Sequence, residues 1–194
     1  MIAAIILAAG QSRRMGQPKM LLPWGRSTVI EHVITVFLRA GIEDIVVVTG
    51  GTREEVAKAT ERYPIRRVHN ADYERGEMLS SLQCGLSAMK DETAAALVAL
   101  GDQPQVEEPT VRLVAEAYRR THLPLVVPSF QRRRGHPWLV GRPLWDELRS
   151  LAPPESPRSF LNRHAAEIHY VEVDTSSILA DLDTPQDYAR FRPL

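Results

Sequence analysis

A short loop near the amino terminus carries the residue types that bind phosphate groups. Residues 9–19 read AGQSRRMGQPK and directly follow an apolar run. The small residues at 8–10 let backbone N–H groups approach a ligand closely, and such amides form concavities that bind anions. Arg13 and Arg14 can each donate bidentate hydrogen bonds to phosphate oxygens, while Lys19 supplies a compact positive charge. The chemistry of this loop is therefore that of a phosphate-binding loop.

The loop matches neither of the two commonest phosphate motifs. Five residues separate Gly10 from Gly16 and Gln17 follows, which breaks the Walker A spacing, and Ser12 breaks the G-x-G-x-x-G pattern. Lysine occurs only at positions 19, 58 and 90 among 24 basic residues, so Lys19 stands out within the loop. Taken alone, the loop fits a phosphate site and a solvated, arginine-bearing turn about equally well.

Aspartates in two distant segments are candidate ligands for a divalent cation. Asp102 follows the apolar run 97–100, and magnesium favours carboxylates together with phosphate oxygens and water. An Asp-x-Pro turn that bonds only its own backbone is the alternative for Asp102. Near the carboxyl terminus, Asp181, Asp183 and Asp187 crowd one segment. Asp187 has a clear structural role as a first-turn acid of a helix, and a structural role is also favoured for Asp181.

Two serines begin a segment with helical periodicity. Apolar residues at 79, 82, 86 and 89 predict a helix, and Ser80 and Ser81 lie near its start. Side chains at a helix N-terminus can contact the base or ribose of a ligand, or can simply cap the helix. Cys84 in the same segment is expected to be a small buried residue and not a nucleophile, because no motif pairs it with a base.

A basic segment with a histidine lies farther along the chain. Arg132–Arg134 are three consecutive arginines, followed by Gly135 and His136. Such a run is usually a solvated patch, but beside a phosphate-handling site it could receive the phosphate of an acceptor substrate. His136 is the residue that we expect to take part. The histidines show no spacing typical of a zinc site.

The strands that must position these residues are visible as short apolar runs. Longer segments with helical periodicity lie between several of the runs, and this alternation predicts a mainly parallel sheet. Ligands bind where loops leave the carboxyl ends of such strands, so we expect the phosphate loop and Asp102 to be neighbours. The runs are 3–8, 45–49, 65–68, 96–100, 125–128 and 168–173.

Local signals predict where helices begin. Ser27 is expected to cap a helix over 28–40, and Thr52 and Glu55 to form a capping box for a helix that continues to about residue 62. Three further signals are Pro109 for a helix over 109–121, the break at Pro153–Pro157 before another helix, and Thr184 capping a last helix from Pro185. A short strand is expected at Gly135–Val140.

The composition is that of a globular protein. The 194 residues include 44% hydrophobic and 25% charged residues, and 24 basic residues balance 24 acidic ones, which argues against disorder and against general nucleic-acid binding. Cys84 is the single cysteine, so no intrachain disulfide can form. No apolar run is long enough to span a bilayer. We therefore expect one soluble, cytoplasmic domain with no membrane partner.

Several motifs together resemble one family. The run LAAGQSRRMGQPKMLLPWG resembles the first motif of the MobA-like NTP transferase family, which includes the molybdenum cofactor cytidylyltransferases and guanylyltransferases. GEMLSSLQCGL at 76–86, LGDQPQV at 100–106 and DLDTPQDY at 181–188 match further motifs in the right order. GHPWLVGRPLWDEL at 135–148 resembles the cytidylyltransferase branch.

The resemblance implies a fold and a set of site residues. It implies a three-layer α/β/α, Rossmann-like nucleotidyltransferase fold with a mostly parallel sheet, as a single domain over 1–194 with 130–165 as a candidate flap on the acceptor side. Lys19, Arg14 and Asp102 are the expected catalytic residues, and Asp102 and Asp183 the expected ligands of Mg²⁺. The nucleotide is expected at Leu7, Ala8, Ala9, Gly10, Ser12, Arg13, Gly16, Ser80 and Ser81, and the acceptor at Arg134, Gly135 and His136.

The resemblance also implies a reaction. CMP would pass from MgCTP to the phosphate of molybdenum-loaded molybdopterin, and pyrophosphate would be released. Cytosine is favoured over guanine because guanylyltransferases tend to have glycine at the position of Ala9. The alternatives are a guanylyltransferase, a transferase for a sugar or alcohol phosphate, and a nucleotide-binding or cofactor-delivery protein without turnover. A molybdoenzyme or its chaperone is an expected partner.

Overall fold

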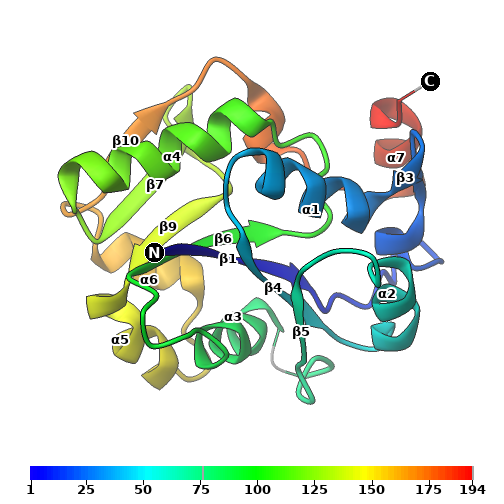
Figure 1. Ribbon diagram of the computed structural model, residues 1–194, viewed down its shortest axis with the longest axis horizontal. Coiled ribbons are helices and arrows are strands. Elements are labelled where there is room, and N and C mark those ends of the chain that lie inside the picture. The colour runs from blue at the N-terminus through cyan, green and yellow to red at the C-terminus, as the bar shows by residue number, and fades with distance from the viewer. Residues whose placement is uncertain (76, 194) are drawn as a thin grey trace.

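The computed structural model describes residues 1–75 and 77–193 and has a mixed, mostly parallel sheet at its centre (Figure 1). The strands are β1 (Ile2–Ala8), β4 (Asp44–Thr49), β5 (Arg66–His69), β6 (Ala95–Leu100), β7 (Leu125–Phe130), β8 (Arg133–Arg134), β9 (Trp138–Gly141) and β10 (His169–Glu172). Their order is β10-β7-β9-β6-β1-β4-β5, with β8 paired to β7. β9 runs antiparallel to both of its neighbours and β8 to β7, while the other pairs are parallel. Each predicted strand is present, with ends within two residues of the prediction except at Gly135–Val140, where the strand begins at Trp138.

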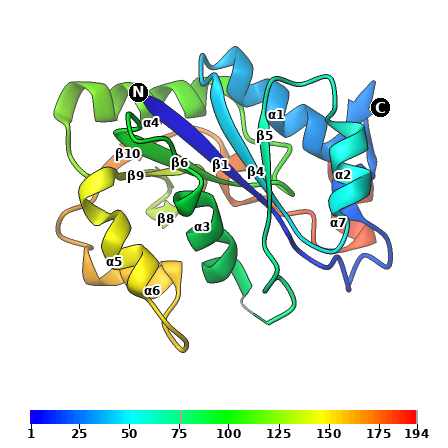
Figure 2. The same ribbon diagram turned by 60° about the horizontal axis from the view of Figure 1, so that its bottom comes forward.

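Helices cover both faces of this sheet, which confirms the three-layer fold. The helices are α1 (Val29–Arg39), α2 (Arg53–Ala59), α3 (Glu77–Ser87), α4 (Glu108–Thr121), α5 (Trp145–Ser150), α6 (Pro157–Arg163) and α7 (Pro185–Phe191), with short 3-10 helices η1 (Lys19–Leu21), η2 (Arg142–Leu144) and η3 (Ser176–Leu179). α1 and α4 lie on one face, and α3, α5 and α6 on the other (Figures 1 and 2). A separate ribbon of β2 (Pro23–Trp24) and β3 (Ser27–Thr28) precedes α1.

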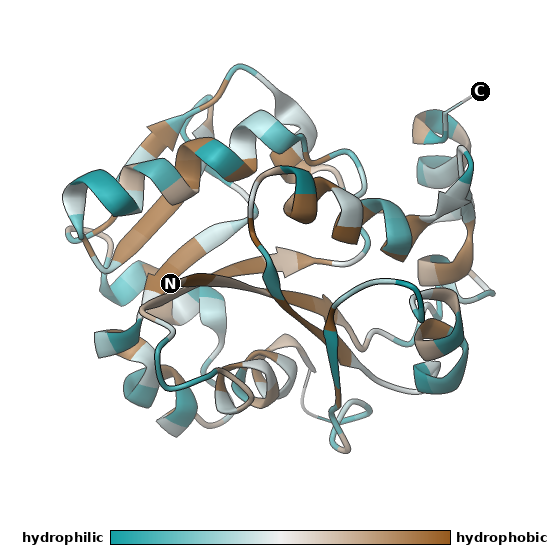
Figure 3. Cartoon of the chain, viewed as in Figure 1, coloured by the Kyte–Doolittle hydropathy of each residue, from teal (hydrophilic) through white to brown (hydrophobic). Residues whose placement is uncertain are grey.

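The alternation of β1 side chains joins the sheet to both helical layers. Ala4, Ile6 and Ala8 belong to the core that α1 and α4 complete, while Ile5 and Leu7 belong to the core that α3, α5 and α6 complete. A strand covered on both faces must be apolar along its whole length, which explains the unbroken run at the amino terminus. In Figure 3 the central strands are accordingly brown, and the outer helices carry teal segments. No helix of the described residues is long and apolar enough to cross a membrane.

The cap of α1 differs from the prediction by one residue. Thr28, not Ser27, is the N-cap: its hydroxyl accepts from the N–H of Glu31, and the Glu31 carboxylate accepts from the N–H of Thr28 at 2.9 Å. Ser27 instead pairs with Trp24 in the ribbon of β2 and β3, which delays the start of the helix. The prediction of Ser27 as cap was therefore wrong.

The capping box predicted for α2 is also absent. Thr52 is at the N-cap position, but its side chain makes no capping hydrogen bond, since its ψ of 32° is not the extended conformation that a capping hydroxyl needs. The helix ends at Ala59, earlier than expected, and the next residue, Thr60, is fully buried with its hydroxyl bonded to Val56 O. The box at the last helix does form, because the Thr184 hydroxyl accepts from the N–H of Asp187.

Candidate active site

Three loops with small residues leave adjacent strands at one edge of the sheet. β1 lies between β4 and β6, with Ala8 opposite Thr49 and Leu7 opposite Leu100, so their carboxyl ends are level. The phosphate loop follows β1, a pair of glycines follows β4, and Gly101 and Asp102 follow β6. The N–H of Gly101 donates to the carbonyl of Leu7 at 2.9 Å, which extends the pairing to the start of the Asp102 loop. The predicted proximity of the phosphate loop and Asp102 is thus confirmed.

Lys19 is the centre of a charged cluster at this edge. Its ammonium bonds to Asp102 Oδ2 and lies 3.4 Å from Asp183 Oδ1. Arg14 Nη2 lies 3.0 Å from the other oxygen of Asp183. The Lys19 and Asp102 side chains are only 10% and 13% exposed, whereas that of Arg14 is 72% exposed. The structure therefore brings together four charged residues from three segments of the sequence: the phosphate loop, the Asp102 segment and the carboxyl-terminal segment.

The backbone of the phosphate loop is fixed from within. The Ser12 hydroxyl accepts from the N–H of Lys19 at 3.1 Å, and its carbonyl accepts from the N–H groups of Met15 and Gly16. Ser12 and Gly16 have φ values of 51° and 72°, in the left-handed region that a turn of this tightness requires. The Met15 side chain is buried in a small apolar cluster that includes Leu182 and Trp24. Arg13 and Arg14 project from this anchored turn as exposed side chains.

The segments that carry Asp102 and Asp183 are joined by two further contacts. The N–H of Leu182 donates to the carbonyl of Asp102 at 3.0 Å, and the Gln103 amide donates to Asp181. Burial raises the pKa of Asp181, and the charges of Asp102 and Asp183 act in the same direction. Asp181 thus has a structural contact of the kind favoured from the sequence. Gln103 was missed, because a glutamine between Asp and Pro carries no signal until its partner is known.

The two serines of α3 share one buried partner. Asn70, in the loop after β5, donates its side-chain amide to the hydroxyls of Ser80 and Ser81 at 2.8 and 3.0 Å. Its own N–H donates to the carbonyl of Thr49, so it links the start of α3 to the end of β4. Asn70 was not singled out from the sequence. Gly76, the first residue of the matching segment, lies outside the described residues.

Cys84 packs against the core that α3 completes, but it is less buried than was expected. It is half-buried, and its thiol lies 3.6 Å from the carbonyl of His69. Burial raises the pKa of the Cys84 thiol, which keeps it protonated at neutral pH.

A cavity of about 940 Å³ opens beside the segment 132–136. The expected arginine loop is in fact a tight hairpin between β7 and β8, in which Gln131 and Arg132 have φ values of 50° and 64°, as the favoured two-residue turn requires. Arg134 on β8 lines the cavity and is held there by Tyr170 and Asn162: its guanidinium donates to the Tyr170 hydroxyl at 2.9 Å and to Asn162 Oδ1 at 2.8 Å. Among the contacts between described side chains, those of Arg134 are the ones that order an arginine of this segment.

Gly135 is required by packing. A Cβ atom there would lie 2.4 Å from the carbonyl oxygen of Ile178, which also accepts from the N–H of His136 at 3.1 Å. Ile178 belongs to η3, and Leu179 of η3 lines the cavity. The chain then continues directly to Asp183, so one segment connects the cavity with the charged cluster.

His136 lines the cavity as a neutral side chain. Burial lowers its pKa from 6.5 to about 4. As the pH falls below 6.5, the unfolded chain binds a proton at this histidine that the folded chain does not bind until about pH 4. Folding stability is therefore lost over this window, by at most about 3 kcal/mol.

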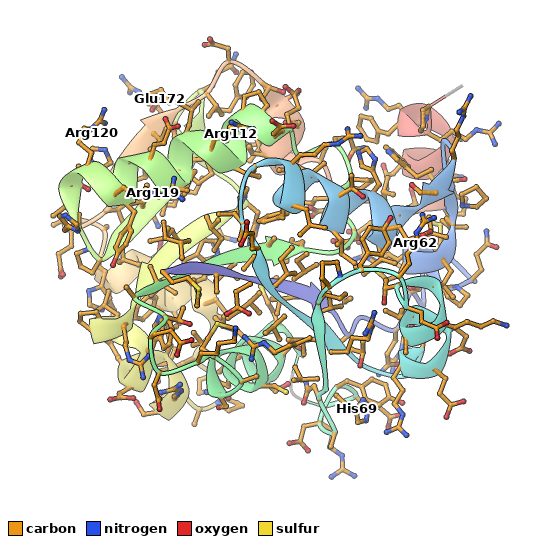
Figure 4. All side chains as sticks on the ribbon, in the orientation of Figure 1. Arg62, His69, Arg112, Arg119, Arg120 and Glu172 are labelled. Atoms are coloured by element: carbon orange, nitrogen blue, oxygen red, sulfur yellow. The ribbon has the colours of Figure 1, made fainter. Side chains whose placement is uncertain are left out.

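We expect His136→Gln to remove the loss of folding stability that His136 causes between pH 6.5 and about 4. The measurement is urea unfolding of both proteins at several pH values between 7 and 4. His69→Gln is the matched control, because His69 is exposed at the end of β5 (Figure 4), so that the same substitution there replaces no buried ring. Parallel stability profiles for His136→Gln and the parent would contradict the prediction.

Comparison with known proteins identifies relatives over most of the chain. A family described as the MobA-like NTP transferase domain matches residues 4–168. The molybdenum cofactor cytidylyltransferase of Escherichia coli is 30% identical over 96% of this chain and 93% of its own length. The nicotine blue oxidoreductase of Paenarthrobacter nicotinovorans is 29% identical, over 97% and 95%. The similarity thus extends over proteins named for different reactions.

A solved structure shows the same fold. A protein from Mycobacterium tuberculosis superposes with a TM-score of 0.84 at 27% sequence identity, covering 98% of this chain and 97% of its own. The same protein has been solved as a complex with manganese, with a TM-score of 0.80 at 25% identity, covering 97% of this chain and 96% of its own.

Proposed function

Because the chain belongs to the MobA-like NTP transferase domain family and is a nucleotidyltransferase, we propose that it transfers CMP from MgCTP to the phosphate of molybdenum-loaded molybdopterin. The observation that carries the proposal is the cluster of Lys19, Asp102 and Asp183 beside a phosphate loop. A protein that only bound nucleotide would have no need for two carboxylates and a buried lysine at one point. The name of the Escherichia coli relative supports the choice of acceptor.

The reaction needs no nucleophile from the protein. An acceptor phosphate with a second pKa of about 6 is largely ionised at neutral pH. One of its oxygens forms a bond to the α-phosphorus of the nucleotide, the bond from that phosphorus to the bridging oxygen breaks, and pyrophosphate leaves with the electron pair. In this proposal Lys19 and Arg14 neutralise charge on the phosphates, and backbone N–H groups at 8–10 bind their oxygens. Ser12, Arg13, Gly16 and the serines of α3 complete the nucleotide site.

The carboxylates suit a divalent cation. Asp102 and Asp183 offer the hard oxygen ligands that magnesium prefers, and the ammonium between them indicates that the position accommodates positive charge. Among the described residues no group of three or more His, Cys, Asp or Glu side chains could hold a metal ion. The remaining ligands would therefore be substrate phosphates and water. When bound, magnesium would supply charge neutralisation at the phosphates.

The acceptor is assigned to the cavity beside residues 132–136. Arg134 is already ordered by Tyr170 and Asn162, so little further side-chain entropy is lost when its guanidinium binds a phosphate. His136 offers a neutral ring as a hydrogen-bonding group, and Gly135 lets the backbone pass close to Ile178. The segment 130–165, which contributes Arg134, Gly135 and His136, is the proposed acceptor side of a single domain.

The proposal is tested by anaerobic pyrophosphate release. CTP and GTP are supplied separately with magnesium and molybdenum-loaded molybdopterin, and Asp102→Ala is the blank. We expect release with CTP that disappears in the variant, since Ala9 favours cytosine. Release with GTP alone would be consistent with the proposed mechanism but would overturn the assignment of cytosine as the base. No release with either nucleotide would overturn the assignment of the acceptor or the proposed transferase reaction.

A further inference from the structure

The Lys19 ammonium lies where a cation between Asp102 and Asp183 would lie. We infer that Lys19 holds both carboxylates in the nucleotide-free protein and excludes divalent cations from them, and that the triphosphate draws Lys19 away and so admits the metal. The inference rests on the proposed function for the identity of the triphosphate ligand. It makes metal and nucleotide binding mutually dependent, with Lys19 as the element that couples them.

The charge balance of the cluster supports exclusion. Lys19 and Asp102 are both nearly buried, so their attraction is only weakly screened by solvent. Asp183 faces a second cation, because Arg14 lies 3.0 Å from its free oxygen. The nearby carboxylate of Asp181 is engaged by Gln103. A divalent ion that entered without phosphates would therefore meet two carboxylates whose charge is already compensated.

The local structure also explains how Lys19 can leave. Its backbone is fixed, because its N–H donates to the Ser12 hydroxyl and it begins η1. The Lys19 side chain has four rotatable bonds, and only the side chain must move for the ammonium to reach phosphates bound by the loop. A triphosphate offers the ammonium more negative charge than the two carboxylates, so the exchange is favourable. Because binding couplings are reciprocal, the metal must then raise nucleotide affinity by the same factor.

The test is a titration of nucleotide-free protein with Mn²⁺, followed by the electron paramagnetic resonance signal of the free ion. We expect Lys19→Met to bind one Mn²⁺ about tenfold more tightly than the parent protein, a change of about 1.4 kcal/mol. Lys19→Arg retains the charge and should show no gain. Lys90→Met is the matched control: Lys90 pairs with Asp44 at 3.6 Å, outside the cluster, so its loss changes net charge equally without freeing Asp102.

Mn²⁺ binding to Lys19→Met that is no tighter than to the parent would overturn the inference, as would an equal gain in Lys90→Met. Circular dichroism checks that each variant is folded, and Lys19→Gln replaces Lys19→Met in the same titration if the latter is not. The readout involves neither CTP nor molybdopterin. Tighter Mn²⁺ binding to Lys19→Met, together with no pyrophosphate release by the parent protein, would therefore support the inference while the proposed reaction fails. Pyrophosphate release by the parent protein without tighter Mn²⁺ binding to Lys19→Met would support the reaction and overturn the inference.

Discussion

Asp102→Asn is expected to lower the turnover number for pyrophosphate release by about a hundredfold to a thousandfold, the range typical for loss of one preorganised charge-stabilising group. The amide is neutral, so it no longer contributes a negative charge to a cation site or to the orientation of Lys19. The fold should survive, because the contact to Leu182 uses the backbone carbonyl of Asp102 and not its side chain. The Michaelis constant for CTP should change much less than the turnover number.

A surface aspartate provides the control for this variant. Asp146 pairs with Arg149 but is 96% exposed, so Asp146→Asn should retain the turnover of the parent protein. Thermal unfolding checks that both variants are folded. Unchanged turnover in Asp102→Asn would remove Asp102 from the proposed set of metal ligands.

Lys19→Met is expected to lower kcat/KM for CTP by about a hundredfold or more, through a different combination of constants. Lys19 is proposed to bind the phosphates both before and during the transfer, so its loss should raise the Michaelis constant as well as lower the turnover number. Lys19→Arg should recover only part of the loss, because a planar guanidinium does not replace a compact ammonium in a nearly buried position.

Lys90→Met again serves as the control and should leave both constants unchanged, since Lys90 lies in a separate ion pair with Asp44. A wild-type kcat/KM in Lys19→Met would mean that the phosphates are held by the loop amides and arginines alone. A change confined to the turnover number would place Lys19 at the transition state only.

The sheet was predictable from sequence because each buried strand leaves a local signal. A strand covered on both faces needs consecutive apolar residues. The short apolar runs at 3–8 and 96–100 are therefore typical of buried strands. The caps were less predictable. Ser27 and Thr28 are both good capping residues, and the choice between them depends on the pairing of Ser27 with Trp24. Thr52 failed as a cap because of its backbone conformation, which its residue type does not reveal.

The charged cluster was predictable in composition but not in geometry. Lys19, Asp102 and Asp183 could be named from motifs, whereas their contact is a tertiary fact that no local pattern contains. Gln103 and Asn70 were missed for the same reason: each acts through a partner, Asp181 for one and the serines of α3 for the other. The hairpin at Arg132 was also hidden, because arginine has no preference for the positive φ it adopts there.

The contact between Leu182 and the Asp102 loop has a consequence for how the protein is made. Met15 and Leu182 share one apolar cluster, and the carbonyl of Asp102 accepts from the N–H of Leu182, although ribosomal synthesis delivers Met15, Asp102 and Leu182 in that order with most of the chain between the first and the last. A nascent chain that has emerged only to β10 already contains Lys19 and Asp102, but it lacks Asp183 and the leucine that closes the apolar cluster over Met15. Synthesis thus delays assembly of the charged cluster until the segment after β10 has emerged.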